Sequence, residues 1–136
     1  PRTCSWFRLR HRKTRKKLIF LNTHFDYQPL ALVESAKVLL AWVRKNADTP
    51  MIVTGDFNTD KQSKTYRILT KYLVDSHPND ENTFHDYGRI DNDCPIDWIL
   101  VSPHFEIKCS EVDHYHENDL YPSDHYPLLA TVEWKL

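Results

Sequence analysis

The stretch PMIVTGDFNTD, residues 50 to 60, joins a short apolar run to a group of polar side chains. Residues 50–55 predict a short buried strand, and Gly55 lets the chain leave that strand. Asp56 and Asn58 follow at once, on either side of a phenylalanine. Because an Asp-x-Asn sequence after a strand is a common cap or turn, this stretch alone fits either a plain turn or a chemical site.

Strand-like and helix-like patterns alternate along the rest of the chain. Apolar residues at helical spacing predict helices over residues 29–46, with Pro29 at the entrance, and over residues 63–73, with Ser63 as the cap. Residues 75–94 are polar and predict a loop. Helices between strands, followed by a run of strands, favour a layered α/β sandwich with mixed sheets. The expected strands are residues 4–11 and 16–25, which would form a hairpin, and residues 50–55, 95–102, 105–115 and 128–134.

The composition fits one globular domain. The chain has 136 residues, of which 40% are hydrophobic and 12% aromatic, and this is enough for one core. The formal net charge is −1, so no overall attraction to nucleic acid or to an anionic membrane is expected. No apolar run is long enough for a transmembrane helix. We expect a monomer.

One segment is locally basic. Its seven cations predict either a solvated hairpin or a patch that faces the substrate, and the sequence leaves both open. They are Arg8, Arg10, Arg12, Lys13, Arg15, Lys16 and Lys17.

The three cysteines, Cys4, Cys94 and Cys109, lie far apart and form no C-x-x-C pair. They indicate neither a disulfide framework nor a zinc site, and we expect small buried apolar side chains. The chain opens on Pro-Arg rather than Met, so the lack of a signal peptide constrains the cellular location only weakly, with the cytoplasm slightly favoured.

Polar residues stand at four strand ends, where an unpaired carboxylate or imidazole would cost several kcal/mol, roughly. Each has an ordinary explanation, such as a hydrogen-bonded core histidine or a turn between prolines. Asp97 is the hardest to explain in this way, because it shares a strand face with apolar residues and has no nearby Lys or Arg. Since all four ends carry such groups, we expect them to meet in one pocket at the edge of the sheets. The polar residues at the four strand ends are His24, the pair Asp56 and Asn58, Asp97, and the pair Asp124 and His125.

This set is rich in oxygen ligands and holds two imidazoles. It contains no nucleophile elbow, no Gly-rich phosphate loop and no activated Cys-His couple. Carboxylate and amide oxygens suit Mg²⁺ or Mn²⁺ rather than zinc. A phosphoester is then the natural substrate class, because metal, His and Asp together can activate water and neutralise a phosphorane-like transition state.

The motifs NTHFD, TGDFNTD, PIDWILVS and YPSDHYPLLATV, in this order, resemble the C-terminal half of the endonuclease/exonuclease/phosphatase superfamily, which has the DNase I-like fold. The opening RTCSWFRLR and the NTFHDYG segment further resemble an uncharacterised bacterial branch. The resemblance implies a four-layer α/β/β/α sandwich, present here as a partial domain of mixed, mostly antiparallel strands with two main helices.

The resemblance also implies catalytic roles. His24 would bind the scissile phosphate and assist the leaving oxygen, and Asp56 would orient or activate the attacking water. Asn58 would hold that water or a phosphate oxygen. Asp97 would fix the tautomer of His125, and His125 and Asp56 are equal candidates for the general base.

Further residues would bind the metal and the substrate. Asp124 would face the Mg²⁺ or Mn²⁺ ion together with Asp56. His85 is either a branch-specific pocket residue or a packing residue of its loop.

Members of the superfamily are roughly twice this long, and the Glu that is their principal metal ligand belongs to an N-terminal half that has no counterpart here. We therefore expect residues 1–136 to be a single partial domain, and to be weakly active or inactive alone. A parent protein with the upstream Glu should hydrolyse phosphoesters.

Two other classes are considered. A calcineurin-type metallophosphatase would need G-N-H-E/D and D-x-H motifs, which are absent. A non-catalytic phosphate or nucleic-acid binding module on the same fold is the stronger alternative. The substrate stays open among nucleic acid, phosphorylated metabolites, inositol phosphates and lipids, with a slight preference for a phosphodiester.

Overall fold

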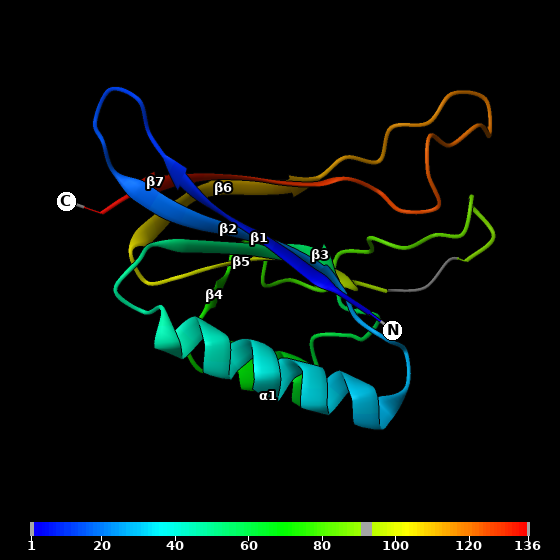
Figure 1. The fold of residues 1–136 in the computed structure, drawn as a ribbon. Coiled ribbons are helices and arrows are strands. Elements are labelled where there is room, and N and C mark those ends of the chain that lie inside the picture. Colours follow the sequence, from blue (N-terminus) through cyan, green and yellow to red (C-terminus); the bar gives the residue numbers. More distant parts are fainter. Residues whose placement is uncertain (1, 91–93, 136) are drawn as a thin grey trace.

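Two β-sheets form the centre of the computed structural model, which describes residues 2–90 and 94–135 (Figure 1). One sheet has five strands in the order β1-β2-β3-β5-β4, and the other pairs β6 with β7. Strands β2 and β3 are parallel and the other neighbours are antiparallel, as predicted. The elements are β1 Cys4–Arg10, β2 Lys17–His24, α1 Pro29–Lys45, β3 Met51–Asp56, α2 Lys64–Leu69, β4 Val74–Asp75, β5 Asp97–Val101, β6 Phe105–Val112 and β7 Leu128–Trp134.

The elements stack as an α/β/β arrangement, which confirms the layered α/β prediction. Helix α1 covers one face of the five-stranded sheet, and the β6–β7 pair lies over the other face (Figure 1). Ile19 and Leu21 of β2 are almost fully buried, as are Ala36 and Val43 of α1, and they belong to one core cluster. Because side chains alternate along a strand, the stripe that contains His24 lies on the opposite face of β2, where it is half-buried to exposed.

Helix α2 is shorter than the predicted residues 63–73. Ser63 caps it as expected, since its side chain accepts a hydrogen bond from the backbone of Tyr66. At the other end, the Thr70 hydroxyl donates to the Tyr66 carbonyl at 2.9 Å, and such a local side-chain bond competes with continuation of the helix. The chain then turns into β4, which the sequence did not predict.

The prediction of a polar loop over residues 75–94 is wrong in part. Residues 91–93 of it lie outside the described residues. Among the others, Asp75 belongs to β4, and five polar side chains are buried. The segment is thus mostly loop, as predicted, but parts of it are packed into the fold, whereas residues 78–80 and 87–89 are exposed. The buried polar residues are Asp75, Ser76, His77, Thr83 and His85.

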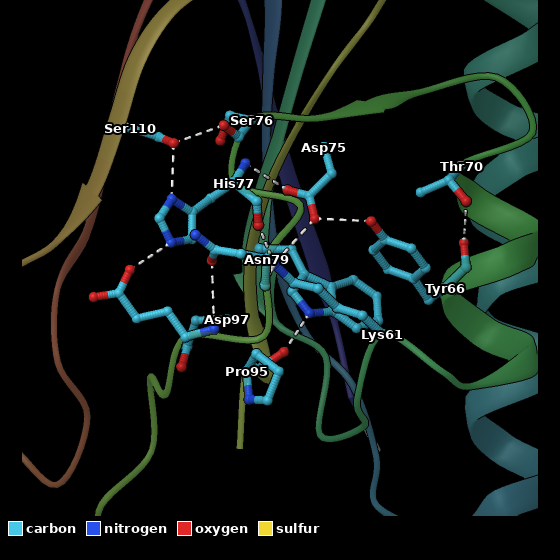
Figure 2. A network of polar contacts seen from close by, with 12 residues as sticks. Lys61, Tyr66, Thr70, Asp75, Ser76, His77, Asn79, Pro95, Asp97 and Ser110 are labelled. Atoms are coloured by element: carbon cyan, nitrogen blue, oxygen red, sulfur yellow. Dashed lines mark hydrogen bonds and ion pairs between the residues drawn. The ribbon is translucent and has the colours of Figure 1, made fainter. Parts of the chain in front are cut away.

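A buried polar network joins α2, β4 and β6 (Figure 2). Lys61 Nζ lies 3.2 Å from Asp75 Oδ2, and their side chains are only 4% and 3% exposed. The same carboxylate oxygen accepts from the Tyr66 hydroxyl at 3.0 Å. Burial, together with Asp75, raises the pKa of Tyr66. On the other side, His77 Nδ1 lies 2.8 Å from Ser110 Oγ on β6, so the network connects the two sheets.

The cysteines do not behave as predicted. Cys4 and Cys109 are exposed and Cys94 is partly buried. Cys4 lies on β1, which is exposed throughout because it forms the edge of its sheet. Cys109 lies at an irregularity of the β6–β7 pairing. All three are free thiols.

The basic segment consists of the end of β1, the turn between β1 and β2, and Lys17 at the start of β2, and its cations are exposed. Neither helix of the described chain is long and apolar enough to cross a membrane.

Candidate functional site

Three predicted site residues lie side by side across three strands. His24 on β2 is paired with Asp56 on β3, and Asp56 is paired with Asp97 on β5. Parallel β2 and β3 end at the same edge of the sheet, and antiparallel β5 begins there. The strand order therefore brings the three polar ends into one row.

His125 completes the row from a separate segment. Its Nδ1 atom lies 2.7 Å from Asp97 Oδ2, and its Nε2 atom lies 3.9 Å from Asp56 Oδ2. His24 Nε2 is 3.3 Å from the same Asp56 oxygen. One carboxylate oxygen thus faces two imidazoles, and the second carboxylate holds one of them.

The hydrogen bond to Asp97 selects the tautomer of His125. An ionised carboxylate can only accept, so Nδ1 must carry the proton that is shared with Asp97. In the neutral ring, the lone pair then lies on Nε2, on the side of Asp56. This arrangement is suited to accepting a proton at Nε2 while Asp97 stabilises the resulting positive charge.

The surroundings raise the pKa values of Asp56 and His125. Burial raises the pKa of the Asp56 carboxyl, while the backbone N–H of Asn58 acts in the opposite direction. The hydrogen bond that His125 donates to Asp97 raises the pKa of the His125 imidazole, with burial opposing it. Both groups therefore hold protons more firmly than in a solvated chain, which suits acid and base chemistry.

Asn58 orients Asp56 rather than lining the pocket. Its backbone N–H donates to Asp56 Oδ1 at 2.8 Å, and its side-chain amide donates to the Phe25 carbonyl at 2.8 Å. Its φ of 50° is in the left-handed region that Asn tolerates well. Asp56 Oδ1 is thereby occupied, and Oδ2 is left to face the two histidines.

Thr83 connects the segments that carry Asp97 and His125, and the sequence did not single it out. It is 1% exposed. Its hydroxyl accepts from the backbone N–H groups of Ile96 and Asp97, each at 3.1 Å, and its carbonyl accepts from Tyr126 N at 2.8 Å. The only available signal was length, since long loops inside a compact domain are usually functional or misassigned.

The structure places Asp124 and His85 beside the row but not in it. Asp124 accepts a hydrogen bond from Ser123 Oγ at 3.3 Å, and its carbonyl accepts from the backbone N–H of His85 at 3.0 Å. His85 is buried, stacks on Tyr126 with ring centroids 3.9 Å apart, and accepts at Nδ1 from Gly88 N. Burial lowers the pKa of His85. Their predicted metal and substrate roles stay predictions.

The row also offers ligands for a cation. One ligand atom each from Asp56, Asp97 and His125 lie within 4.8 Å of one another. Two carboxylates and an imidazole fit a divalent cation chemically, but they are only part of the six ligands that Mg²⁺ takes. Water, substrate oxygens or further acidic groups would have to supply the rest.

A hollow of about 500 Å³ opens in front of the row, between the inner face of the five-stranded sheet and the start of β7. His24, Asp56, Asp97 and His125 all line it, together with Ser123. Its size is within the range of small-molecule sites, and its few polar groups converge on one place, as is usual in such sites.

A sequence profile of the endonuclease/exonuclease/phosphatase family matches residues 13–125. The chain belongs to this family. The family is one of phosphoester hydrolases, and the predicted DNase I-like fold class is confirmed by solved relatives.

Two solved structures from Bacteroides thetaiotaomicron illustrate the likeness. One is an endonuclease/exonuclease/phosphatase family protein that is 30% identical, with a TM-score of 0.89. The match covers 100% of the present chain and 57% of the chain of that protein. The other is a mannosyl-6-phosphatase that is 27% identical, with a TM-score of 0.84. The match covers 98% of the present chain and 58% of the chain of the phosphatase. The present chain therefore spans little more than half the length of these relatives.

A curated relative is the CCR4-Not complex 3'-5'-exoribonuclease subunit Ccr4 of Debaryomyces hansenii. It is 25% identical over an alignment of 95 residues, and the match covers 58% of this chain and 11% of the relative. The named relatives thus include one phosphatase and one nuclease.

Proposed function

We propose that this chain carries the water-activating part of a metal-dependent phosphoester hydrolase site. The observation that supports this most strongly is the continuous row from His24 through Asp56 to the Asp97–His125 pair. A module that only bound phosphate would have no need for a carboxylate that fixes the tautomer of a histidine.

In the proposed reaction, the attacking water lies between Asp56 and His125. Asp56 Oδ2 orients it, and either Asp56 or His125 Nε2 takes its proton. Asp97 keeps His125 in place and stabilises the imidazolium. His24, which is 54% exposed at the mouth of the row, contacts the scissile phosphate and assists the leaving oxygen. Asn58 supports this geometry by fixing Asp56, and we propose that it also holds the attacking water or a phosphate oxygen.

A divalent cation, Mg²⁺ or Mn²⁺, would be held by Asp56 and Asp124. Asp56, Asp97 and His125 are the only metal-donor cluster found among the described residues, so further ligands would have to come from other groups. When bound, such an ion neutralises charge on phosphate oxygens. Because the described donors are too few for a closed site, we propose that full activity needs the longer protein with a further acidic ligand. We also propose that this chain alone is weakly active or inactive, and that it is monomeric.

The substrate class is a phosphoester, and the relatives are a sugar phosphatase and an exoribonuclease by name. His85 is proposed to contribute to substrate choice through its packing against the His125 segment. A phosphodiester is slightly preferred over a phosphomonoester.

The test is a hydrolysis assay on a simple phosphodiester, a sugar phosphate, plasmid DNA and single-stranded RNA, with Mg²⁺, Mn²⁺ or EDTA. The protein is the longer parent, with this chain beside it. Asp97→Asn should lower kcat by about 100-fold or more while phosphate affinity is retained. Asp48→Asn, an exposed aspartate at the other end of β3, is the matched control and should act like the wild type.

Loss of phosphate binding together with activity in Asp97→Asn would favour a binding module instead. A metal-supplemented parent that hydrolyses none of these substrates would overturn the proposal.

A further inference from the structure

The basic turn lies at the end of the molecule opposite to the candidate active site. His24 ends β2, whereas Lys17 begins it, and a strand of this length spans about 25 Å. Figure 1 shows the β1–β2 turn at one end of the sheets and the segment before β7 at the other. The turn therefore cannot be the substrate-facing rim of the row that contains Asp56.

More than half of the chain's 18 Lys and Arg residues gather at this basic end, although the net charge is −1. Helix α1 also ends here, since Arg8 Nη2 donates to Asn46 Oδ1 at 3.3 Å. The basic end consists of Arg8, Arg10, Arg12, Lys13, Arg15, Lys16 and Lys17 from the turn, Arg44 and Lys45 from α1, and Lys135 after β7.

The seven cations of the basic segment are not neutralised by carboxylates of the described chain. They are exposed, and none of the seven forms an ion pair with a carboxylate in residues 2–90 or 94–135. Clustered like charges repel one another and weaken a compact state. An external polyanion would remove this repulsion.

The backbone of the turn is ordered by its own hydrogen bonds. His11 N donates to the Lys16 carbonyl at 2.8 Å, and Arg15 N donates to the His11 carbonyl at 3.0 Å. The His11 ring and the Thr14 hydroxyl are 2.7 Å apart. The cations are thus displayed on a fixed loop, which reduces the entropy lost on binding a partner.

An aromatic ring lies next to these cations in a hollow of about 670 Å³, lined by Arg15, Lys16, Lys17, His104, Trp134 and Lys135 among others. Lys16 Nζ is 5.6 Å from the centre of the Trp134 ring. The Nε1 atom of Trp134 is buried and has no acceptor among the described residues. The hollow thus sets an indole ring beside four cations, Arg15, Lys16, Lys17 and Lys135.

We propose that the basic end binds single-stranded nucleic acid, with phosphates at the cations of the turn and a base in the hollow beside Trp134. Positive grooves combined with an aromatic platform are the usual means of binding single strands. A single strand is favoured over a duplex because only unstacked bases can enter such a hollow. The site is separate from the proposed catalytic row, so it does not depend on hydrolysis.

The test measures fluorescence anisotropy of a labelled single-stranded oligonucleotide of about 12 nucleotides. It uses the 136-residue chain in EDTA, so that no metal-dependent cleavage interferes. We expect binding that weakens steeply with salt, and quenching of tryptophan fluorescence by the bound bases.

Matched variants locate the site. The triple variant Arg12→Gln, Lys13→Gln and Lys16→Gln should weaken binding about 10-fold or more and reduce the salt slope by about 2, as expected for three lost phosphate contacts. The control triple variant Lys64→Gln, Arg67→Gln and Lys71→Gln makes the same charge change on exposed positions of the α2 segment, and it should bind like the wild type. Melting curves of all variants report whether each one is folded.

Trp134 separates base stacking from charge attraction. Trp134→Leu should lose the quenching and weaken binding about 5-fold or more, whereas Trp134→Phe should retain most of the affinity. The proposal is overturned if the oligonucleotide does not bind, if both triple variants weaken binding equally, or if the Trp134 variants bind unchanged. Tighter binding to heparin or to phosphatidylserine vesicles than to the oligonucleotide would also overturn it.

Discussion

Gly55 sets how closely the strands approach at the candidate site. It is paired with Thr23 on β2 and with Trp98 on β5. A Cβ atom at this position would collide with the backbone carbonyl of Thr23, which cannot move without breaking the β2–β3 pairing. Asp56 follows immediately, so the position of its carboxylate depends on this close approach.

Gly55→Ala should therefore destabilise the chain by about 1–3 kcal/mol, the usual range for forcing extra atoms into a packed region. Urea unfolding followed by circular dichroism measures this change. Ser5→Ala, on the exposed edge strand β1, is the control and should stay within about 0.5 kcal/mol of the wild type. An unchanged unfolding free energy in Gly55→Ala would show that β2 and β3 have room to separate.

His85 should make stability depend on pH. Because burial lowers the pKa of His85, the unfolded chain binds the proton more readily than the folded one. The stability that neutral His85 contributes is therefore present above about pH 6.5, the usual pKa of a histidine in an unfolded chain. This stability is lost as the pH falls below that value. Protonation at Nδ1 would also remove the bond from Gly88 N.

The comparison with His85→Phe isolates this effect, because the variant keeps the stacking on Tyr126 but cannot titrate. The stability advantage of the wild type over His85→Phe should shrink as the pH is lowered from 7.5 to 5, roughly across the usual range of histidine. Urea unfolding at several pH values measures it. A constant difference would mean that His85 titrates alike in both states.

At the scale of elements, sequence patterns predicted the helices and strands whose positions depend on neighbouring residues in the chain. The apolar spacing located α1 and the β1–β2 hairpin, and the Ser63 cap located the start of α2. They predicted that His24, Asp56 and Asp97 would meet in one pocket, but not the pairing that sets them in a row, because the register between strands depends on partners distant in sequence. Nor did they give the burial of Thr83, since a polar composition is the same in a solvated loop and in one that is packed by long-range hydrogen bonds.

Thr83 offers a test of that packed segment. Thr83→Val keeps the shape but removes the acceptor of the Asp97 N–H group, whereas Ile96 N still donates to the Cys94 carbonyl at 2.9 Å. A buried donor without an acceptor costs about 1–3 kcal/mol, so the variant should lose about that much unfolding free energy, measured with urea. Thr83→Ser restores the hydroxyl and should recover most of the loss. A Thr83→Val variant as stable as the wild type, with Thr83→Ser destabilised, would assign the effect to the methyl group instead.

At the scale of the whole molecule, the two ends of the sheets differ in chemistry. The carboxylates and imidazoles of the candidate site lie at one end, and the cations of the basic end lie at the other. Between them, the network of Figure 2 ties the five-stranded sheet to β6, because Ser110 Oγ donates to the Ser76 carbonyl at 2.7 Å and contacts His77. The buried Lys61–Asp75 pair lies at the centre of this connection.

Lys61→Met should therefore destabilise the chain by about 3–5 kcal/mol, since it leaves the Asp75 carboxylate buried without its cation. The double variant Lys61→Met and Asp75→Asn should recover part of this loss, because it leaves no unpaired charge. The amide oxygen can still accept from His77 N, and the amide NH₂ can donate to the Tyr66 hydroxyl. Lys37→Met is the matched control: Lys37 forms a shorter pair with Glu34, at 2.6 Å, but the two side chains are 54% and 65% exposed. Removing an exposed pair should change the unfolding free energy by less than about 1 kcal/mol. If Lys61→Met proves as mild as Lys37→Met in urea unfolding, water reaches Asp75 and the connection between the sheets does not depend on that ion pair.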